Sequence, residues 1–305
     1  MYAALTYFGQ GTLICKSSSA LDNGKTVSVT DGKKTWSGVI ADGVCVFKAL
    51  PAKQKYTVCL INGDNVEYAT EVIFGFGDCK EIDVGLDKTT WKGLKAIVNA
   101  GLASEMLAVG DQISAVVGGE KQVFDIIHID YKAGTYGHNI VLAKHTCLAA
   151  TKQMNTSDTN VGGYKATLIA DYLDNDYYDS LPADMKSVIT QMTYQASIGN
   201  KNSALQNEEH KVWLPLEYNI FGATTYAAAT EVTTGNAEQF AYFATAANRI
   251  KTLGDTGSAC DWWLSSPNVS NATSFCTVDT AGTATGYHYA SDSIGVLPCF
   301  LIAAD

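Results

Sequence analysis

The first third of the chain alternates apolar and polar residues over short runs. Residues 26–30, Thr-Val-Ser-Val-Thr, show the two-residue period of a half-buried strand. The turn pairs Asp31-Gly32, Asp42-Gly43 and Asn62-Gly63 separate this run from its neighbours. Further strands are predicted over residues 36–40, 44–50, 56–61 and 66–74. Short strands at this spacing predict an all-β, immunoglobulin-like sandwich over about residues 1–87.

The pattern changes near Lys88, where apolar residues begin to recur at helical spacing. In the second predicted helix, Leu168, Ile169, Tyr172 and Leu173 share one face. Helices are predicted over residues 91–98, 165–175, 182–193 and 237–249, and strands over 112–117, 122–130, 141–144 and 212–216. Residues 88–305 are therefore expected to form a second domain, of class α+β, with early helices and irregular β-structure late in the chain.

Composition restricts the classes of partner. Apolar residues make up 47 % of the 305, which excludes intrinsic disorder, and only 17 % are charged. The net charge of −10 disfavours nucleic acid as a partner, because phosphate binding requires clustered positive charge. No run of 18 apolar residues is present, and residues 1–13 lack the pattern of a secretion signal. We expect no membrane insertion and no signal peptide.

Motifs for metal, cofactor or catalytic chemistry are missing from the sequence. The eight cysteines form no Cys-x-x-Cys pair, and several lie in apolar strands, so buried, reduced thiols are expected. The acidic run Asp171 to Asp179 has Asp179 where a calcium loop requires glycine. The five histidines show no metal-binding spacing, and no dinucleotide or nucleophile-elbow motif occurs. The sequence thus predicts no cofactor, no metal and no enzymatic activity.

The C-terminal region has the composition of a binding loop. Residues 265–295 are rich in Ser, Thr, Asn and Gly, and contain only Asp279 and Asp292 as charged residues. Tyr287-His288-Tyr289 lies inside this segment. Tyrosine provides rigid contact area at low entropic cost, while Ser and Asn provide adaptable hydrogen bonds. A binding surface is favoured over an ordinary polar loop.

Seven motifs, in order along residues 88–305, resemble a known family. They are Trp91 to Gly101 followed by Val109-Gly110-Asp111, Gln153-Met154-Asn155, Gly162-Gly163-Tyr164 with Tyr172-Leu173, Leu181-Pro182 to Ile189, Val212 to Gly222, Asp261 to Pro267, and Gly295 to Phe300. This segment resembles the C-type-lectin-like domain of phage and prophage tail proteins and of diversity-generating-retroelement variable proteins. That domain is itself distantly similar to formylglycine-generating enzymes. Ser265 and Leu297 replace two arginines of the family's motifs.

The resemblance implies a virion-associated adhesin or receptor-binding protein, made in the host cytoplasm, whose sandwich anchors or spaces the ligand-binding domain. Ligand-facing residues of diversified relatives correspond to residues 265–293 here. The expected partners are a host cell-surface glycan or protein, other virion proteins, and further copies of the chain, as a trimer by analogy. Trp262 and Trp263 are expected to hold the base of the loop, with at least one of them buried. The predicted ligand-binding residues are Asn268, Ser270, Asn271, Thr273, Ser274, Tyr287, His288, Tyr289, Ser291 and Asp292.

Three alternatives remain open. The same loops suit a structural head-fibre or decoration protein that contacts other virion proteins. A formylglycine-generating type of enzyme would need a reactive cysteine pair, for which Cys276 and Cys299 are the late candidates. A bacterial surface adhesin is the third alternative.

Overall fold

The computed structural model describes residues 10–17, 22–73, 75, 77–84, 87–233, 238–255 and 257–305. Residues at the start of the predicted sandwich, at its end (85–86) and at the start of the predicted helix 237–249 lie outside these ranges. The chain divides into two compact units, Met1–Leu102 and Ala103–Asp305. The boundary that the sequence suggests, near residue 87, precedes this division by one helix, α1 (Trp91–Asn99).

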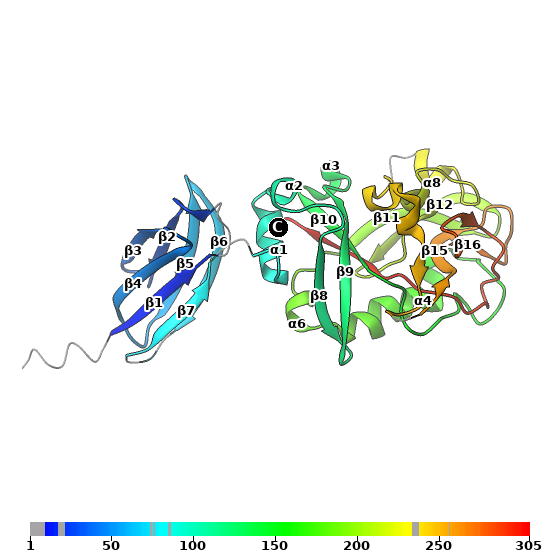
Figure 1. Ribbon diagram of the computed structural model, residues 1–305. Helices are drawn as coiled ribbons and strands as arrows, with labels where there is room; N and C mark the ends of the chain where they lie inside the picture. Colours follow the sequence, from blue (N-terminus) through cyan, green and yellow to red (C-terminus); the bar gives the residue numbers. More distant parts are fainter. Residues whose placement is uncertain are drawn as a thin grey trace, which may run out of the picture. The chain divides into compact units, whose positions relative to one another are not determined.

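The first unit contains two β-sheets (Figure 1). One sheet has the strand order β4-β1-β7, in which β1 pairs with β4 antiparallel and with β7 parallel. The other has the order β3-β2-β5-β6 and is antiparallel throughout. The strands are β1 (Gln10–Lys16), β2 (Thr26–Thr30), β3 (Thr35–Val39), β4 (Val44–Pro51), β5 (Lys55–Asn62), β6 (Asn65–Ile73) and β7 (Cys79–Asp83).

Alternating side chains of both sheets meet in one core, as the two-residue period predicts. On β5, Tyr56, Val58 and Leu60 are fully buried, while the residues between them are partly exposed. Val27 and Val29 of β2 join them from the neighbouring strand. The predicted strands of this region are confirmed, whereas β1 and β7 were not predicted.

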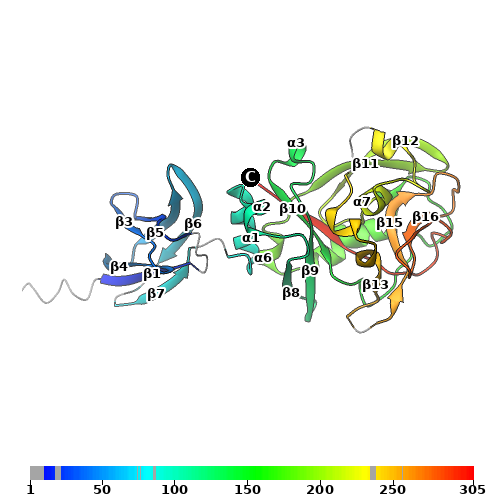
Figure 2. The same cartoon turned by 45° about the horizontal axis from the view of Figure 1, so that its top comes forward.

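The second unit is built around a four-stranded antiparallel sheet with the order β18-β10-β9-β8. Its C-terminal strand β18 (Cys299–Ala303), red in Figure 1, pairs with β10 (Asn139–Lys144). Every residue of β10 and β18 is buried, so these strands form the centre of the unit. The other strands, β8 (Gln112–Val117) and β9 (Glu120–Ile129), form a long hairpin beside them, seen from a second side in Figure 2.

Three smaller sheets follow along the chain. A hairpin joins β11 (Met192–Gly199) to β12 (Asn202–His210), and β13 (Lys251–Thr252) pairs with β14 (Ala259–Cys260). The third sheet has the order β15-β16-β17 and carries the loop predicted to bind ligand. Its strands are β15 (Trp262–Pro267), β16 (Phe275–Val278) and β17 (Ala284–Thr285).

The helices of the second unit are shorter than the apolar periodicity predicts. In place of the expected helix 165–175 the structure has a 3₁₀ turn, η3 (Tyr164–Ala166), followed by the short helix α4 (Leu168–Tyr172). Thr167 is the N-cap of α4, and its side chain accepts a hydrogen bond from the Ala170 N–H at 3.1 Å. Leu168, predicted to lie on the apolar face, is 51 % exposed, and Ile169 and Ala170 are the residues of α4 that are buried. A π-helical turn η4 (Leu173–Tyr177) and α5 (Tyr178–Ser180) follow directly.

Two other helix predictions and one strand prediction are wrong in length. The helix predicted over 182–193 is only α6 (Ala183–Lys186), because the chain turns to bridge Thr190 to Leu301. The helix predicted over 237–249 is two 3₁₀ turns, η5 (Ala241–Ala244) and η6 (Ala246–Arg249), separated by the extended backbone of Thr245. The expected strand 212–216 is reduced to a bridge between Trp213 and Cys299. The remaining short helices are α2 (Ala103–Met106), α3 (Ala133–Tyr136), α7 (Glu217–Phe221) and α8 (Thr230–Thr233).

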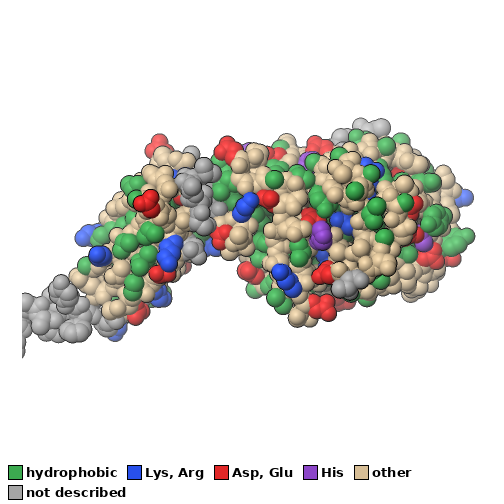
Figure 3. All heavy atoms as spheres, viewed as in Figure 1, with side chains coloured by type: hydrophobic (Ala, Val, Ile, Leu, Met, Phe, Trp, Pro, Cys, Tyr) green, Lys and Arg blue, Asp and Glu red, His purple; other side chains and the backbone are tan. Residues whose placement is uncertain are grey.

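Strands predominate over helices, and the class α+β is confirmed. No helix among the described residues is both long and apolar enough to span a membrane. On the face shown in Figure 3, acidic and basic side chains are interspersed with neutral ones.

Candidate functional site

Two buried tryptophans anchor the base of the C-terminal loops. Trp262 and Trp263 are both fully buried in β15, which confirms the expectation that at least one would be. The Trp262 indole N–H donates to the Arg249 carbonyl at 3.0 Å, and that of Trp263 to the Lys152 carbonyl at 2.8 Å. Because each polar edge is satisfied, the rings contribute their full apolar area to the core beneath the loops.

The buried side-chain amide of Asn160 forms hydrogen bonds with the backbone of the loop between β15 and β16. Its Nδ2 group lies 2.7 Å from the Asn271 carbonyl and 2.8 Å from the Ser274 carbonyl, and its Oδ1 accepts from the Asn200 N–H at 2.7 Å. A fully buried side chain that satisfies several backbone groups at once fixes the path of the backbone. No local pattern predicts this contact, since Asn160 lies more than 100 residues before the loop.

His288 is fixed between two carboxylates. Its Nε2 lies 2.6 Å from the Asp261 carboxylate and its Nδ1 lies 3.1 Å from Asp292. Asp292 also accepts from the Tyr289 N–H at 2.9 Å. The Tyr287 hydroxyl donates to Asp261 at 3.2 Å, and its ring centroid lies 4.6 Å from that of His288. Since both ring nitrogens of His288 have a carboxylate partner, the orientation of the imidazole ring is fixed.

The end of the same segment is attached to residues near 153–160. The Ser291 hydroxyl donates to Asp158 at 2.5 Å, and the Ala290 carbonyl accepts from the Asn155 N–H at 2.9 Å. Ala290 in turn donates its N–H to the Thr273 carbonyl at 2.8 Å, which links the two predicted loops directly. Asp158 and Asp261 therefore belong to the site, although the sequence pattern did not identify them.

The predicted ligand-binding residues fall into two groups by burial. Asn268 and Ser274 are buried, so the structure does not present them on the surface as predicted. Asn268 instead donates to the Gly286 carbonyl at 2.9 Å and supports the loop from inside. Tyr287 and Tyr289 are 62 % and 50 % exposed. The partly or largely exposed group is Ser270, Asn271, Thr273, Tyr287, His288, Tyr289, Ser291 and Asp292.

Buried carboxylates lie behind the loop. Glu231 accepts from the Ser266 hydroxyl at 2.6 Å and from the Ser197 N–H at 3.0 Å. Glu217 accepts from the backbone N–H groups of residues 225–227. Burial raises the pKa of Glu231 to about 7, and the nearby carboxylates of Glu217 and Glu208 add to this, against the opposing effect of its hydrogen bonds. The support of the loop is thus sensitive to pH.

The late cysteines are placed in the core rather than in a cleft. Cys276 and Cys299 are fully buried, and burial raises the pKa of both thiols. A thiol with a raised pKa is a poor nucleophile at neutral pH. Across the described ranges, no cluster of three or more His, Cys, Asp or Glu side chains could hold a metal ion.

A family model described as a domain of unknown function, DUF6273, matches residues 137–304, more than half of the chain. The chain belongs to the DUF6273 family. The matched region contains β10, β18 and all ten predicted ligand-binding residues. The DUF6273 match thus covers the loops and the strands that support them, and leaves the sandwich outside.

Two solved structures show a low similarity. One is described as a "putative carbohydrate binding protein" from Bacteroides uniformis, with 14 % identity and a TM-score of 0.20, over 39 % of this chain and 52 % of that one. The chain therefore spans about half the length of that protein. The other is a DUF3823 family protein from Bacteroides ovatus, with 7 % identity and a TM-score of 0.19, over 66 % of this chain and 74 % of that one. No curated protein matches.

Proposed function

We propose that this protein is an adhesin that binds a host-surface glycan or protein through a face centred on Tyr287 and Tyr289, here called the tyrosine face. The observation that carries the proposal is that two large aromatic side chains are exposed on a backbone that hydrogen bonds hold in place. Both tyrosines project into solvent, while the backbone between them is fixed by His288, Asp261 and Asp292. Large exposed aromatic residues on a fixed backbone are typical of binding surfaces.

The hydrogen bonds beneath the tyrosine face lower the entropic cost of binding. Tyr287 packs on the His288 ring and bonds to Asp261, so its ring is held before any ligand arrives. Immobilising a free side chain on binding costs about 0.5–1.5 kcal/mol, and here part of that cost is met during folding. Ser270, Asn271, Thr273, Ser291 and Asp292 surround the tyrosines with hydrogen-bonding groups.

The setting that we propose follows from the seven ordered motifs. They favour a virion-associated receptor-binding protein, in which residues 1–87 anchor or space the binding domain. Several copies in one particle would convert weak single sites into firm attachment, so we propose a homo-oligomer, with a trimer by analogy.

Cell binding by the full chain tests the tyrosine face. We expect labelled protein to bind a subset of a panel of bacterial strains saturably, and the double variant Tyr287→Ser/Tyr289→Ser to bind about tenfold to a hundredfold more weakly. Tyrosines that act as hot spots of an interface contribute about 2 kcal/mol or more, and about 1.4 kcal/mol corresponds to a factor of ten.

Val116→Ser is the matched control, because Val116 is 63 % exposed on a different element, β8. Equal binding by the tyrosine variant and the wild type would contradict the placement of the site. If no strain is bound by the protein at any concentration, the adhesin proposal is wrong and the structural decoration protein is favoured.

A further inference from the structure

Four short segments of the second unit pair with one another in a closed ring. Residues 146–148 pair with β13, β13 pairs with β14, the chain after β14 pairs with residues 294–296, and these pair back with residues 146–148. The contacts that close the ring are the hydrogen bonds from the Gly295 N–H to the Asp261 carbonyl at 2.8 Å and from the Leu148 N–H to the Val296 carbonyl at 2.9 Å. Each segment thus has two neighbours, and the segments of Cys147 and Cys260 face each other across the ring.

Gly295 leaves room inside the ring for both cysteine sulfurs. A Cβ atom at position 295 would lie 2.9 Å from Cys147 Sγ and 2.9 Å from Cys260 Sγ, too close for either contact. The two sulfurs therefore lie side by side in the space that a side chain of residue 295 would need, and a hydrogen bond joins the two thiols. Sulfur atoms in hydrogen-bond contact need only a small further approach to reach the S–S length of about 2.05 Å.

The two thiols differ in exposure and in acidity. Cys260 is partly exposed, whereas Cys147 is fully buried. The hydrogen bond from Cys147 lowers the pKa of Cys260, while burial raises the pKa of Cys147 well above its usual value. An accessible thiolate is the group that an oxidant attacks first, and a neighbouring thiol then resolves the product. Cys260 has the properties of the first thiol and Cys147 those of the second.

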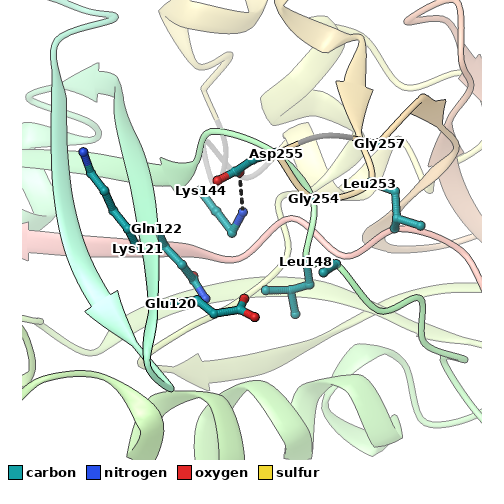
Figure 4. A pocket seen from close by; sticks show the side chains of 10 residues that line it. Glu120, Lys121, Gln122, Lys144, Leu148, Leu253, Gly254, Asp255 and Gly257 are labelled. Carbon is teal, nitrogen blue, oxygen red and sulfur yellow. Dashed lines mark ion pairs between the residues drawn. The ribbon is translucent and has the colours of Figure 1, made fainter.

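Two ammonium groups lie near Cys147. The Lys144 Nζ donates to the Cys147 carbonyl at 3.4 Å, and Figure 4 shows the ion pair of Lys144 with Asp255. Lys251 of β13 is buried as well. Both positive charges lower the pKa of Cys147 against the larger effect of burial, so they favour the loss of its proton when its sulfur attacks.

We propose that Cys147 and Cys260 are a redox modification site, in which hydrogen peroxide converts the thiol pair into a disulfide across the ring. The Cys260 thiolate attacks one peroxide oxygen, the O–O bond breaks, and hydroxide leaves and takes up a proton, which gives water and a sulfenic acid on Cys260. The Cys147 sulfur then attacks the Cys260 sulfur, the S–O bond breaks, and the hydroxyl group leaves as water with the Cys147 proton. Two thiols and one peroxide give one disulfide and two waters, because the sulfurs lose the two electrons that the peroxide gains.

The disulfide fixes the base of the C-terminal loops. Strand β14 leads directly into β15, which carries Trp262 and Trp263, and Gly295 follows the segment of the tyrosine face. A bond between positions that are more than 100 residues apart restricts the unfolded chain strongly, so it stabilises the folded unit. This thiol chemistry does not depend on the proposed adhesin role.

A second cysteine pair provides an internal comparison. Cys15 and Cys45 lie directly opposite each other on β1 and β4. Both are buried, and burial raises the pKa of both thiols. We therefore expect Cys15 and Cys45 to remain reduced under conditions that oxidise Cys147 and Cys260.

The test treats the full chain with one equivalent of hydrogen peroxide at neutral pH, blocks the remaining thiols, and digests the protein with trypsin and chymotrypsin. Trypsin alone leaves residues 252–305 in one piece, and chymotrypsin cleaves after Trp262, which separates Cys260 from the later cysteines. We expect a peptide of Cys147 linked to one of Cys260, the loss of two of the eight free thiols, and release of the link by dithiothreitol. The melting temperature of the second unit should rise by at least about 5 °C.

Two variants and the wild type decide the outcome. Cys260→Ser should abolish the linked peptide and the rise in melting temperature, whereas Cys79→Ser, which removes an exposed cysteine of the first unit, should change neither. Eight free thiols after treatment of the wild type, or oxidation of Cys260 to a sulfinic acid without a link to Cys147, would overturn the proposal. A link between Cys15 and Cys45 in place of the expected one would overturn it as well. The linked peptide is read from the wild type, so the result stands even where a variant fails to fold.

Discussion

Glu231 makes the structure behind the loop between β15 and β16 sensitive to pH. Its side chain is fully buried and links α8 to β11 and β15 through Ser197 and Ser266. The raised pKa means that the folded protein holds a proton on this carboxyl that the unfolded chain, with a value near 4.5, releases earlier. The contribution of this group to stability is complete below pH 4.5 and is lost as the pH rises through about 7.

Glu231→Gln removes this dependence while keeping the shape of the side chain. Because the shift from 4.5 to about 7 corresponds to about 3 kcal/mol, we expect the free energy of unfolding of the variant, relative to wild type, to rise by about that amount over this pH window. Urea denaturation of both proteins at successive pH values measures it. A difference between Glu231→Gln and wild type that stays constant across this pH window would contradict the assignment.

The hairpin β11–β12 turns through two residues with positive φ, Asn200 at 57° and Lys201 at 58°. This is the geometry of a tight hairpin turn for which glycine is preferred, since a lysine in the left-handed region is strained. The turn is connected to the loop between β15 and β16 through Asn160. The Asn160 side chain accepts a hydrogen bond from the Asn200 N–H and donates one to the Asn271 carbonyl.

Lys201→Gly is expected to stabilise the protein by about 0.5–1 kcal/mol, because it relieves this strain. Thermal unfolding measures the effect. Gly199→Ala tests the opposite case on the same turn: Gly199 has φ of +72°, and a Cβ there would lie 1.8 Å from the Asn160 carbonyl oxygen. We expect a loss of about 3 kcal/mol. A stable Gly199→Ala variant would show that the turn is not fixed as described.

Local patterns predict strands better than helices in this chain. Strand β2 alternates apolar and polar residues, so its burial pattern is visible in the sequence. Strand β1 also buries every second residue, but its consecutive apolar residues Leu13, Ile14 and Cys15 hide the alternation. The helices were overestimated because caps, a π-helical turn and bridges to distant strands interrupt them. The composition of the C-terminal segment identifies Tyr287 to Tyr289. Asn160, Asp158 and Asp261 form hydrogen bonds with residues that are between 19 and more than 100 positions away in the sequence, so no local pattern identifies them.

The two units each contain a core of their own. Leu60 belongs to the core of the first unit, together with Tyr56 and Val58. Units of this kind keep their structure separately, since a domain is stabilised mainly by its own buried residues.

Leu60→Ala is therefore expected to lower the free energy of unfolding of the first unit by about 2–5 kcal/mol and to leave the second unit unchanged. Hydrogen exchange resolved along the full chain measures this: amides within residues 10–84 should exchange faster, and those within 103–305 at the wild-type rate. The exposed Lys48→Ala should alter neither. Faster exchange in both units would show that they unfold together.

The division of the C-terminal loops into inward and outward residues separates folding from recognition. The side chains of Asn268 and Asn160 are buried and bond to backbone carbonyls of the loops, whereas Ser270, Tyr287, Tyr289 and Ser293 are exposed. Substitutions at the outward positions change what the surface presents without removing a buried contact. Such a protein can acquire a new binding specificity through a few changes, each neutral for stability, so its recognition surface is free to evolve faster than the fold that carries it.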